Sequence, residues 1–309
     1  MTDALSEISD GAIPRSLYGY EVIGHLGEGA GSIIYAVSDP ATSQLYALKH
    51  VKVKKKKDHR FVDQLVTEFD IGRKVNHPLV RRSVDLKITR TLLLKPTEAA
   101  LILEMVEGTP CDTHPPTTVE AILHVFQQTI KALHGMHQYG FVHCDLKPNN
   151  ILVASDGRVK IIDLGQACEL GSIKKRIQGT PDFIAPEQVK RQPVTFQTDV
   201  YNLGATFYWM LSGKKLPTLF TVKKGKNSFL VADSIPQPHE LNPQVPQNLS
   251  SLVMECVHVT PSKRPSDMTE LCHRLEIIQD GLLKAARPAA PDPEAPPEET
   301  DLADSACHI

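Results

Sequence analysis

The segment HCDLKPNN, residues 143–150, holds a carboxylate, an ammonium group and a carboxamide within six positions. Asp145 can accept the proton of a hydroxyl nucleophile, and Lys147 can neutralise a phosphoryl group during its transfer. Asn150 can bind a hard cation through its amide oxygen. Because a residue before proline disfavours the helical conformation, the Lys147-Pro148 pair predicts a loop. Together these residue types indicate phosphoryl transfer.

A second carboxylate, Asp163, follows 18 residues later in VKIIDLGQA, directly after an apolar strand-like run. There it could bind Mg²⁺, and Gly165 would leave the following turn free to move. Upstream, LGEGAGSIIY (26–35) places glycines between two strand-like runs, so that the backbone can approach phosphates without Cβ atoms in the way. A glycine-rich hairpin without a ligand is more common, so this segment is informative only together with the others.

The run QLYALKHVKV has the alternation of a strand, which places Ala47 and Lys49 on the same face. Ala47 is small enough to leave room for a flat ring, and Lys49 is long enough to reach a phosphate. Glu68 lies 19 residues further on, in a predicted helix, where it could pair with the Lys49 ammonium. The alternative for both residues is an ordinary solvated surface position.

The elements that must position these residues change character along the chain. Strand-like runs dominate the first third and a 3.6-residue apolar period dominates the remainder, which predicts an α+β protein with two lobes and a cleft between them. Thr117 and Glu120 form a capping-box pattern at the start of one helix. We expect strands near 20–26, 32–39, 44–53, 80–88, 90–96 and 99–106, and helices near 63–75, 117–137, 199–211, 247–258 and 268–284.

Composition excludes several classes of function. A net charge of -2 and a pI near 6.7 argue against a globally basic nucleic-acid binder. No apolar run approaches the roughly 20 residues of a membrane span, and no secretory leader is evident, so we expect a cytoplasmic protein. The six cysteines lack metal-site spacing, which favours free thiols. Residues 1–17 are predicted to be a flexible arm, and 285–309, rich in Pro and acid, a disordered tail.

In their order along the chain, these motifs resemble the protein kinase family over residues 20–278. The resemblance covers the glycine loop at 26–34, the catalytic loop at 143–150 and GTPDFIAPE at 179–187, which is similar to the segment that seats the acceptor peptide. It implies a bilobal protein-kinase-like fold with an antiparallel N-lobe sheet and a mostly helical C-lobe. The kinase domain would span 18–284, with the N-lobe at about 18–104 and the C-lobe at about 108–284.

The resemblance also implies ATP and Mg²⁺ as cofactors and assigns roles to residues. Lys49, Glu68, Asp145 and Lys147 would be catalytic, and Asn150 and Asp163 would hold the metal. Asp199 would brace the catalytic loop, and Arg264 would pair with Glu187. The nucleotide site would be formed by Leu26, Gly27, Glu28, Gly29, Ala30, Gly31, Ser32, Ile33, Ile34, Ala47, Lys49, Glu104, Val106 and Leu152, with Met105 in the hinge and Leu103 at the rear of the pocket.

Lys147 and Thr180 match serine/threonine kinases of the bacterial type, so the expected partner is a protein substrate with a Ser or Thr acceptor. An ATP-binding pseudokinase scaffold is the main alternative, although no catalytic group is missing. A small-molecule phosphotransferase is a weaker alternative, because that family is not expected to keep GTPDFIAPE with Asp199 and Arg264. The simplest interpretation of Lys54–Lys57 is a solvated loop, and the alternative is a docking site for an acidic partner.

Two departures from the family pattern carry further expectations. Gly72 stands where the family generally has a large apolar residue, so we expect a gap and a helix that stays mobile until ATP or a partner fixes it. Cys144 and Cys168 stand where kinases switched on by phosphorylation generally carry basic residues. Activation should therefore not require a phosphate on Ser172 or Thr180. The two thiols are either small buried apolar groups or a redox pair.

Overall fold

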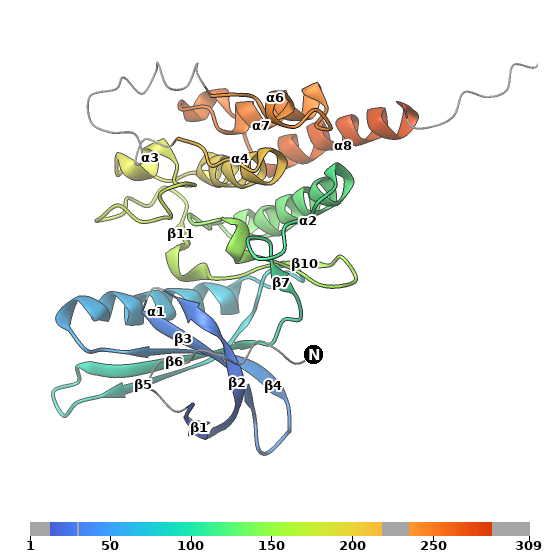
Figure 1. Cartoon of the computed structure of the whole chain (residues 1–309). Coiled ribbons are helices and arrows are strands. Elements are labelled where there is room, and N and C mark those ends of the chain that lie inside the picture. Colours follow the sequence, from blue (N-terminus) through green and yellow to red (C-terminus); the bar gives the residue numbers. More distant parts are fainter. Residues whose placement is uncertain (1–12, 30, 218–234, 286–309) are drawn as a thin grey trace, which may run out of the picture.

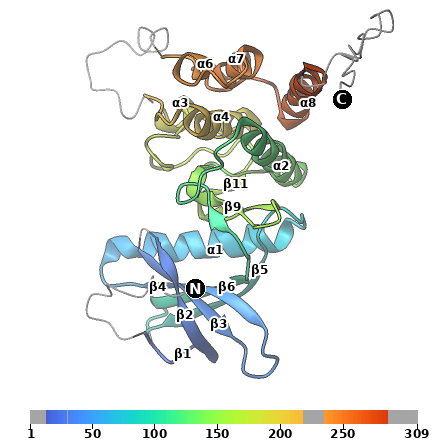
Figure 2. The ribbon, with the colours of Figure 1, turned by 45° about the vertical axis from the view of Figure 1, so that its right-hand side comes forward.

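The computed structural model describes residues 13–29, 31–217 and 235–285, which form two lobes (Figure 1). The N-lobe is an antiparallel six-stranded sheet in the order β1-β2-β3-β4-β6-β5, with helix α1 between this sheet and the C-lobe. The C-lobe is mostly helical, and Figure 2 shows its helices stacked away from the sheet. The predicted bilobal α+β kinase fold is confirmed.

The N-lobe strands follow the alternation of their sequences. Ala47 and Val51 of β4 pack with Leu65 of α1, so one sheet face is covered by this helix. Helix α1 begins four residues before the predicted position 63, and Lys55–Asp58 lead into it. The bounds are β1 Ser16–Leu17, β2 Tyr20–Gly29, β3 Ser32–Ser38, β4 Leu45–Lys52, η1 Lys56–Asp58, α1 His59–Lys74, β5 Ser83–Arg90 and β6 Pro96–Glu104.

Two predictions about the N-lobe are wrong. Residues 90–96 do not form a separate strand: β5 ends at Arg90, and the chain turns back through a hydrogen bond from Thr91 N to Lys95 O (2.9 Å). The apolar letters of RTLLLKP suggested burial, yet Leu92–Leu94 lie exposed in this turn. Ser16–Leu17, predicted to belong to the flexible arm, form β1. Residues 1–12 and 286–309 lie outside the described residues.

The C-lobe core is built on α2 and α4, where Phe126 and Phe207 stack with their ring centroids 3.9 Å apart. The cap of α2 differs from the prediction, because Thr118 rather than Thr117 accepts a hydrogen bond, from Ala121 N (3.2 Å). The helices are α2 Val119–Gln138, α3 Pro186–Val189, α4 Phe196–Ser212, α6 Pro238–Leu241, α7 Gln247–Cys256, η4 Pro261–Lys263 and α8 Met268–Ala285.

Short elements between the lobes carry the chemistry. In one small sheet β9 pairs with both β10 and β7, and in the other β11 pairs with β8, which fixes the loops that join these strands. Their bounds are β7 Thr109–Pro110, β8 Phe141–Val142, η2 Pro148–Asn150, β9 Ile151–Val153, β10 Val159–Ile161, η3 Leu164–Gln166 and β11 Cys168–Glu169. In the described part of the chain, every helix is too short or too polar to cross a membrane.

Candidate active site

A cavity of about 760 Å³ lies between the lobes. The structure brings most of the predicted nucleotide, catalytic and metal residues to its walls: Leu26, Gly27, Glu28, Gly29, Ser32, Ile34, Ala47, Lys49, Val106, Asp145, Lys147, Asn150, Leu152 and Asp163. Gly31 and Ile33 do not line it, since Gly31 packs on Phe61 and Ile33 is 37% exposed. The side chain of Glu104 instead bonds Lys160 and Arg82 N. Ala30 lies outside the described residues.

Lys49 links the two lobes through two ion pairs. Its Nζ lies 2.8 Å from Glu68 Oε2 and 2.9 Å from Asp163 Oδ1. Arg81, which is also buried, approaches the other Glu68 oxygen at 3.5 Å. The predicted Lys49–Glu68 pair is confirmed, and Arg81 adds a second cation that holds the same carboxylate.

These ion pairs determine the protonation states of Lys49 and Asp163. Burial alone would lower the pKa of Lys49, but Asp163 and Glu68 outweigh it and raise that pKa. Burial alone would raise the pKa of Asp163, but Lys49 opposes it and the pKa falls below its usual range. Lys49 therefore stays an ammonium and Asp163 a carboxylate throughout the physiological range of pH.

Asp145 of the catalytic loop faces Lys147 and Thr180. Thr180 donates to Asp145 Oδ1 from its backbone N–H (2.8 Å) and from its hydroxyl (2.9 Å). Lys147 Nζ lies 3.3 Å from Asp145 Oδ2 and donates to Thr180 Oγ1 at 2.9 Å. Burial raises the pKa of Asp145, and the Lys147 ammonium works in the opposite direction. The carboxylate is thus oriented from two sides at the floor of the cavity.

The two predicted metal ligands fit Mg²⁺. Asn150 donates from Nδ2 to Asp145 O (2.9 Å), which leaves its amide oxygen free to accept a cation. Asp163 supplies a carboxylate in the same cavity. Two oxygen donors suit Mg²⁺, which binds one or two protein oxygens and completes its shell with phosphates and water.

Asp199 of α4 fixes the catalytic loop through hydrogen bonds to its backbone. Its carboxylate accepts hydrogen bonds from His143 N (2.8 Å) and Cys144 N (2.9 Å), and it lies 2.9 Å from His137 Nε2. Asp199 is fully buried, so these partners replace the water that the charge has lost. The predicted brace is confirmed.

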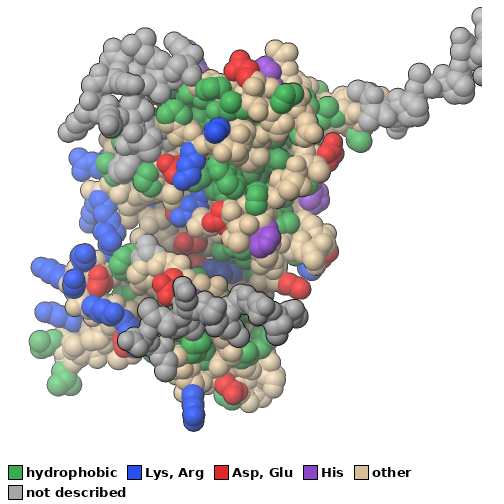
Figure 3. All heavy atoms as spheres, viewed as in Figure 1, with side chains coloured by type: hydrophobic (Ala, Val, Ile, Leu, Met, Phe, Trp, Pro, Cys, Tyr) green, Lys and Arg blue, Asp and Glu red, His purple; other side chains and the backbone are tan. Residues whose placement is uncertain are grey.

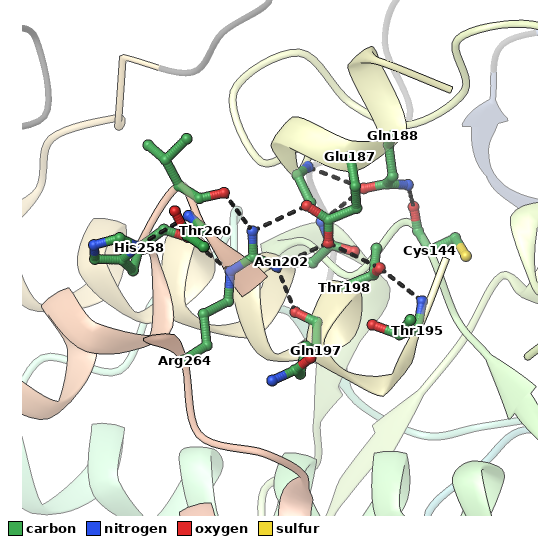
Figure 4. Close-up of polar contacts among 12 residues, drawn as sticks. Cys144, Glu187, Gln188, Thr195, Gln197, Thr198, Asn202, His258, Thr260 and Arg264 are labelled. Atoms are coloured by element: carbon green, nitrogen blue, oxygen red, sulfur yellow. Dashed lines mark hydrogen bonds and ion pairs between the residues drawn. The ribbon is translucent and has the colours of Figure 1, made fainter. Parts of the chain in front are cut away.

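The segment before α4 is tied to the core by a buried network (Figure 4). Arg264 donates to Glu187 from Nη1 (2.8 Å) and Nη2 (2.9 Å), which confirms the predicted pair. Next to it, Gln188 donates to Cys144 O at 2.7 Å, and Asn202 donates to Gln188 Oε1 at 3.1 Å. The loop that carries Asp145 is thereby fixed to the predicted peptide-seating segment.

The predicted gap at Gly72 is absent. A Cβ atom at Gly72 would lie 2.3 Å from Ser83 Oγ and 3.1 Å from Ser83 Cβ. Ser83 Oγ in turn donates to Glu68 O at 2.9 Å. A serine from β5 therefore occupies the space, and the small residue on α1 is needed because of this close approach.

The sequence predicted backbone freedom in the turn at Gly165, but the structure shows an unusual backbone conformation at Asp163 instead. Asp163 has φ 63°, in the left-handed region, whereas Gly165 has an ordinary φ. A Cβ at Gly165 would come within 3.3 Å of Gln64 Cβ. A glycine at 165 therefore suits the close packing of α1 on η3 and is not explained by a positive φ.

Three residues that support the site were not identified from the sequence. Arg81, Ser83 and Gln188 act through contacts with residues 13, 15 and 44 positions away. No local pattern announces such contacts. The only usable signal was the charge of Arg81 inside an otherwise strand-like run.

With this geometry established, comparison with known proteins gives a consistent result. Residues 20–275 match the family model described as the protein kinase domain, so the chain belongs to the protein kinase family. It is similar to serine/threonine-protein kinase PknD of Chlamydia pneumoniae, with 28% identity covering 83% of this chain and 31% of that protein. A probable serine/threonine-protein kinase of Clostridium acetobutylicum is 24% identical, covering 84% of this chain and 40% of that protein.

Similarity extends to animal kinases. Serine/threonine-protein kinase PAK mbt of Drosophila melanogaster is 27% identical over 80% of this chain and 38% of its own length. The chain thus spans between 31% and 40% of the length of these curated relatives.

Proposed function

We propose that this protein is an active serine/threonine protein kinase, which transfers the γ-phosphoryl group of Mg²⁺-ATP to Ser or Thr hydroxyls of a protein substrate. The observation that carries this proposal is the joint placement of Asp145 and Lys147 in one cavity with the Lys49–Asp163 pair. Thr180 hydrogen-bonds both Asp145 and Lys147. This placement supports the proposal because a candidate base, two lysines and the candidate metal ligands face one cavity.

In this proposal each residue has a distinct task. Mg²⁺, held by Asp163 and Asn150, would supply charge neutralisation at the phosphates. Lys49, fixed by Glu68, would orient the phosphates from the N-lobe. Asp145 would orient the acceptor hydroxyl and accept its proton, and Lys147 would neutralise charge that develops on the transferred group.

The resemblance of Lys147 and Thr180 to the residues of serine/threonine kinases favours Ser or Thr as the acceptor. In the structure the Thr180 hydroxyl donates to Asp145 and accepts from Lys147. The relatives are named serine/threonine-protein kinases, which supports the same choice for this chain.

The two alternatives make different predictions. A pseudokinase scaffold would bind ATP without turnover, and intact Lys49, Glu68, Asp145, Asn150 and Asp163 speak against it. A small-molecule phosphotransferase would not need the buried Arg264–Glu187 pair that supports a peptide-seating segment.

Autophosphorylation with γ-labelled ATP tests the proposal. We expect incorporation by the intact chain, and loss of it in Asp145→Asn and in Lys49→Ala. Thermal shift with Mg²⁺-ATP separates binding from chemistry, because Asp145→Asn should still be stabilised by the nucleotide. Stabilisation of the intact chain by ATP without any incorporation, also with added protein substrates, would support the scaffold instead.

Location and partners other than a Ser/Thr protein substrate remain predictions from the sequence. We place the protein in the cytoplasm and assign it no nucleic-acid partner. Lys54–Lys57 are exposed, which fits both a solvated loop and an acidic docking partner. Loss of substrate binding in a variant with these four lysines changed to Gln would favour docking.

A further inference from the structure

The two cysteines next to the catalytic machinery are in contact. Cys144 Sγ and Cys168 Sγ lie 3.6 Å apart. Cys168 belongs to β11, which pairs with β8 so that Cys168 lies opposite Val142, two residues before Cys144. The pair lies among the apolar side chains of Val142, Val194 and Phe196. One thiol thus comes from the segment 163–187, called the activation segment below, and the other from the catalytic loop at 143–150.

The two thiols differ in reactivity. Cys144 is buried, and its hydrogen bond with Cys168, together with burial, raises its pKa. Cys168 is half-buried, and its hydrogen bond with Cys144, assisted by the Lys174 ammonium, lowers its pKa to about 7 against the effect of burial. The thiolate is the reactive form of cysteine, so Cys168 is the nucleophile of the pair.

Other described thiols lack this combination. Burial raises the pKa of Cys111 and of Cys256 to about 12. Cys272 is half-buried like Cys168, but burial and Glu276 raise its pKa. Accessibility and thiolate character coincide at Cys168 among the cysteines in the described ranges, which makes Cys272 a matched control.

We propose that Cys168 and Cys144 form a peroxide-oxidisable dithiol site that couples the activation segment to the catalytic loop. The Cys168 thiolate attacks hydrogen peroxide: an S–O bond forms, the O–O bond breaks, and hydroxide leaves and becomes water with a solvent proton. Cys144 sulfur then attacks the resulting sulfenic acid, and the departing hydroxide takes the Cys144 proton. Two thiols and one peroxide yield one disulfide and two waters, and a dithiol reductant reverses the change.

The disulfide would alter the active site because of where Cys144 is held. Its N–H donates to Asp199 (2.9 Å) and its carbonyl accepts from Gln188 (2.7 Å), while the next residue is the base Asp145. The sulfur atoms must approach from 3.6 Å to about 2.05 Å, and loop or strand must move with them. Since a misplacement of about 1 Å can reduce turnover by ~100-fold, oxidation should slow phosphoryl transfer.

The test uses the full chain treated with hydrogen peroxide at stepwise concentrations. We expect peptide mapping without reductant to find a Cys144–Cys168 crosslink, and phosphotransfer to fall at least about tenfold, with recovery after dithiothreitol. Cys168→Ala should resist peroxide and Cys272→Ala should respond like the intact chain, each relative to its own reduced activity.

The activity arm depends on the proposed kinase function, whereas crosslink mapping does not, so failure of one can be told from failure of the other. Absence of the crosslink at peroxide concentrations that already oxidise Cys272 would overturn the proposal. Equal peroxide sensitivity of Cys168→Ala and the intact chain would overturn it as well, as would full activity of the crosslinked protein. If no crosslink forms, the two residues act only as small apolar groups.

Discussion

Helices α1 and α4 are similar in length and both serve the active site, but they are held in different ways. In α4, 13 of 17 residues are buried, and Asp199 fixes the catalytic loop through backbone hydrogen bonds. In α1, five of 16 residues are buried, and one of these is Glu68, which pairs with Lys49 and Arg81. The C-lobe side of the site is therefore held by extensive apolar packing together with buried polar contacts, whereas the N-lobe side has less packing and depends more on charge.

This difference has a consequence for dynamics. Opening of a structural element is easier where few apolar contacts are lost, so α1 should open before α4. Mobility of α1 was also expected from the sequence, but for a different reason. The structure replaces the supposed gap at Gly72 with a tight contact to Ser83, and the mobility now follows from sparse burial.

The largest expected effect comes from Asp163, where the two regions meet through Lys49. Asp163→Asn should lower phosphotransfer by about 10³-fold or more, because the reaction depends on charge at this position. The fold should persist, as judged by thermal unfolding without ligand. Near-normal turnover by this variant would remove the assignment of Asp163.

The second largest effect is expected for the buried Arg264–Glu187 ion pair of the C-lobe. Arg264→Met leaves Glu187 buried without its partner and should reduce the free energy of unfolding by ~3–5 kcal/mol. Arg274→Met is the matched control, since Arg274 pairs with Glu255 and Glu270 at the surface and should cost below about 1 kcal/mol. Chemical denaturation of both variants checks this, and equal losses would contradict the buried clamp.

Gly72 tests the N-lobe side. Gly72→Leu should destabilise the protein by ~1–3 kcal/mol and slow turnover, because the side chain must displace Ser83. Sequence reasoning alone favoured the opposite result, a steadier α1 and higher activity. Gly72→Ala should be partly rescued by Ser83→Ala, which removes the 2.3 Å contact with Oγ. Strictly additive effects in this double-mutant cycle would show that the contact is not the cause.

The smallest effect is expected for phosphorylation of the activation segment. By the resemblance to protein kinases, Cys144 and Cys168 stand where basic residues would contact a phosphate, and Lys174 already donates to Gln166 O (2.7 Å). Phosphatase-treated enzyme and Ser172→Ala should keep most of their peptide-kinase activity. Loss of most activity in both samples would show that another basic group orders the segment.

The sequence predicted what is encoded locally. Strand alternation and helical periodicity were enough for the fold class. Most walls of the cavity were predicted from the resemblance of the ordered motifs to the protein kinase family. The roles of Ser83 and Arg81 could not be predicted, because they depend on the packing of α1 on β5 and no short sequence pattern indicates that packing. The segment RTLLLKP was wrongly predicted to be a strand, because three consecutive apolar residues favour burial. In the structure these residues form an exposed turn.

Hydrogen–deuterium exchange tests the contrast between the two helices most directly. Without nucleotide, amides in the middle of α1 should exchange at least about tenfold faster than those in the middle of α4, and Mg²⁺-ATP should slow exchange in α1 more than in α4. Arg81→Met should speed exchange in α1 and leave α4 unchanged. Equal protection of α1 and α4 without nucleotide, or no response of α1 to Arg81→Met, would contradict the account.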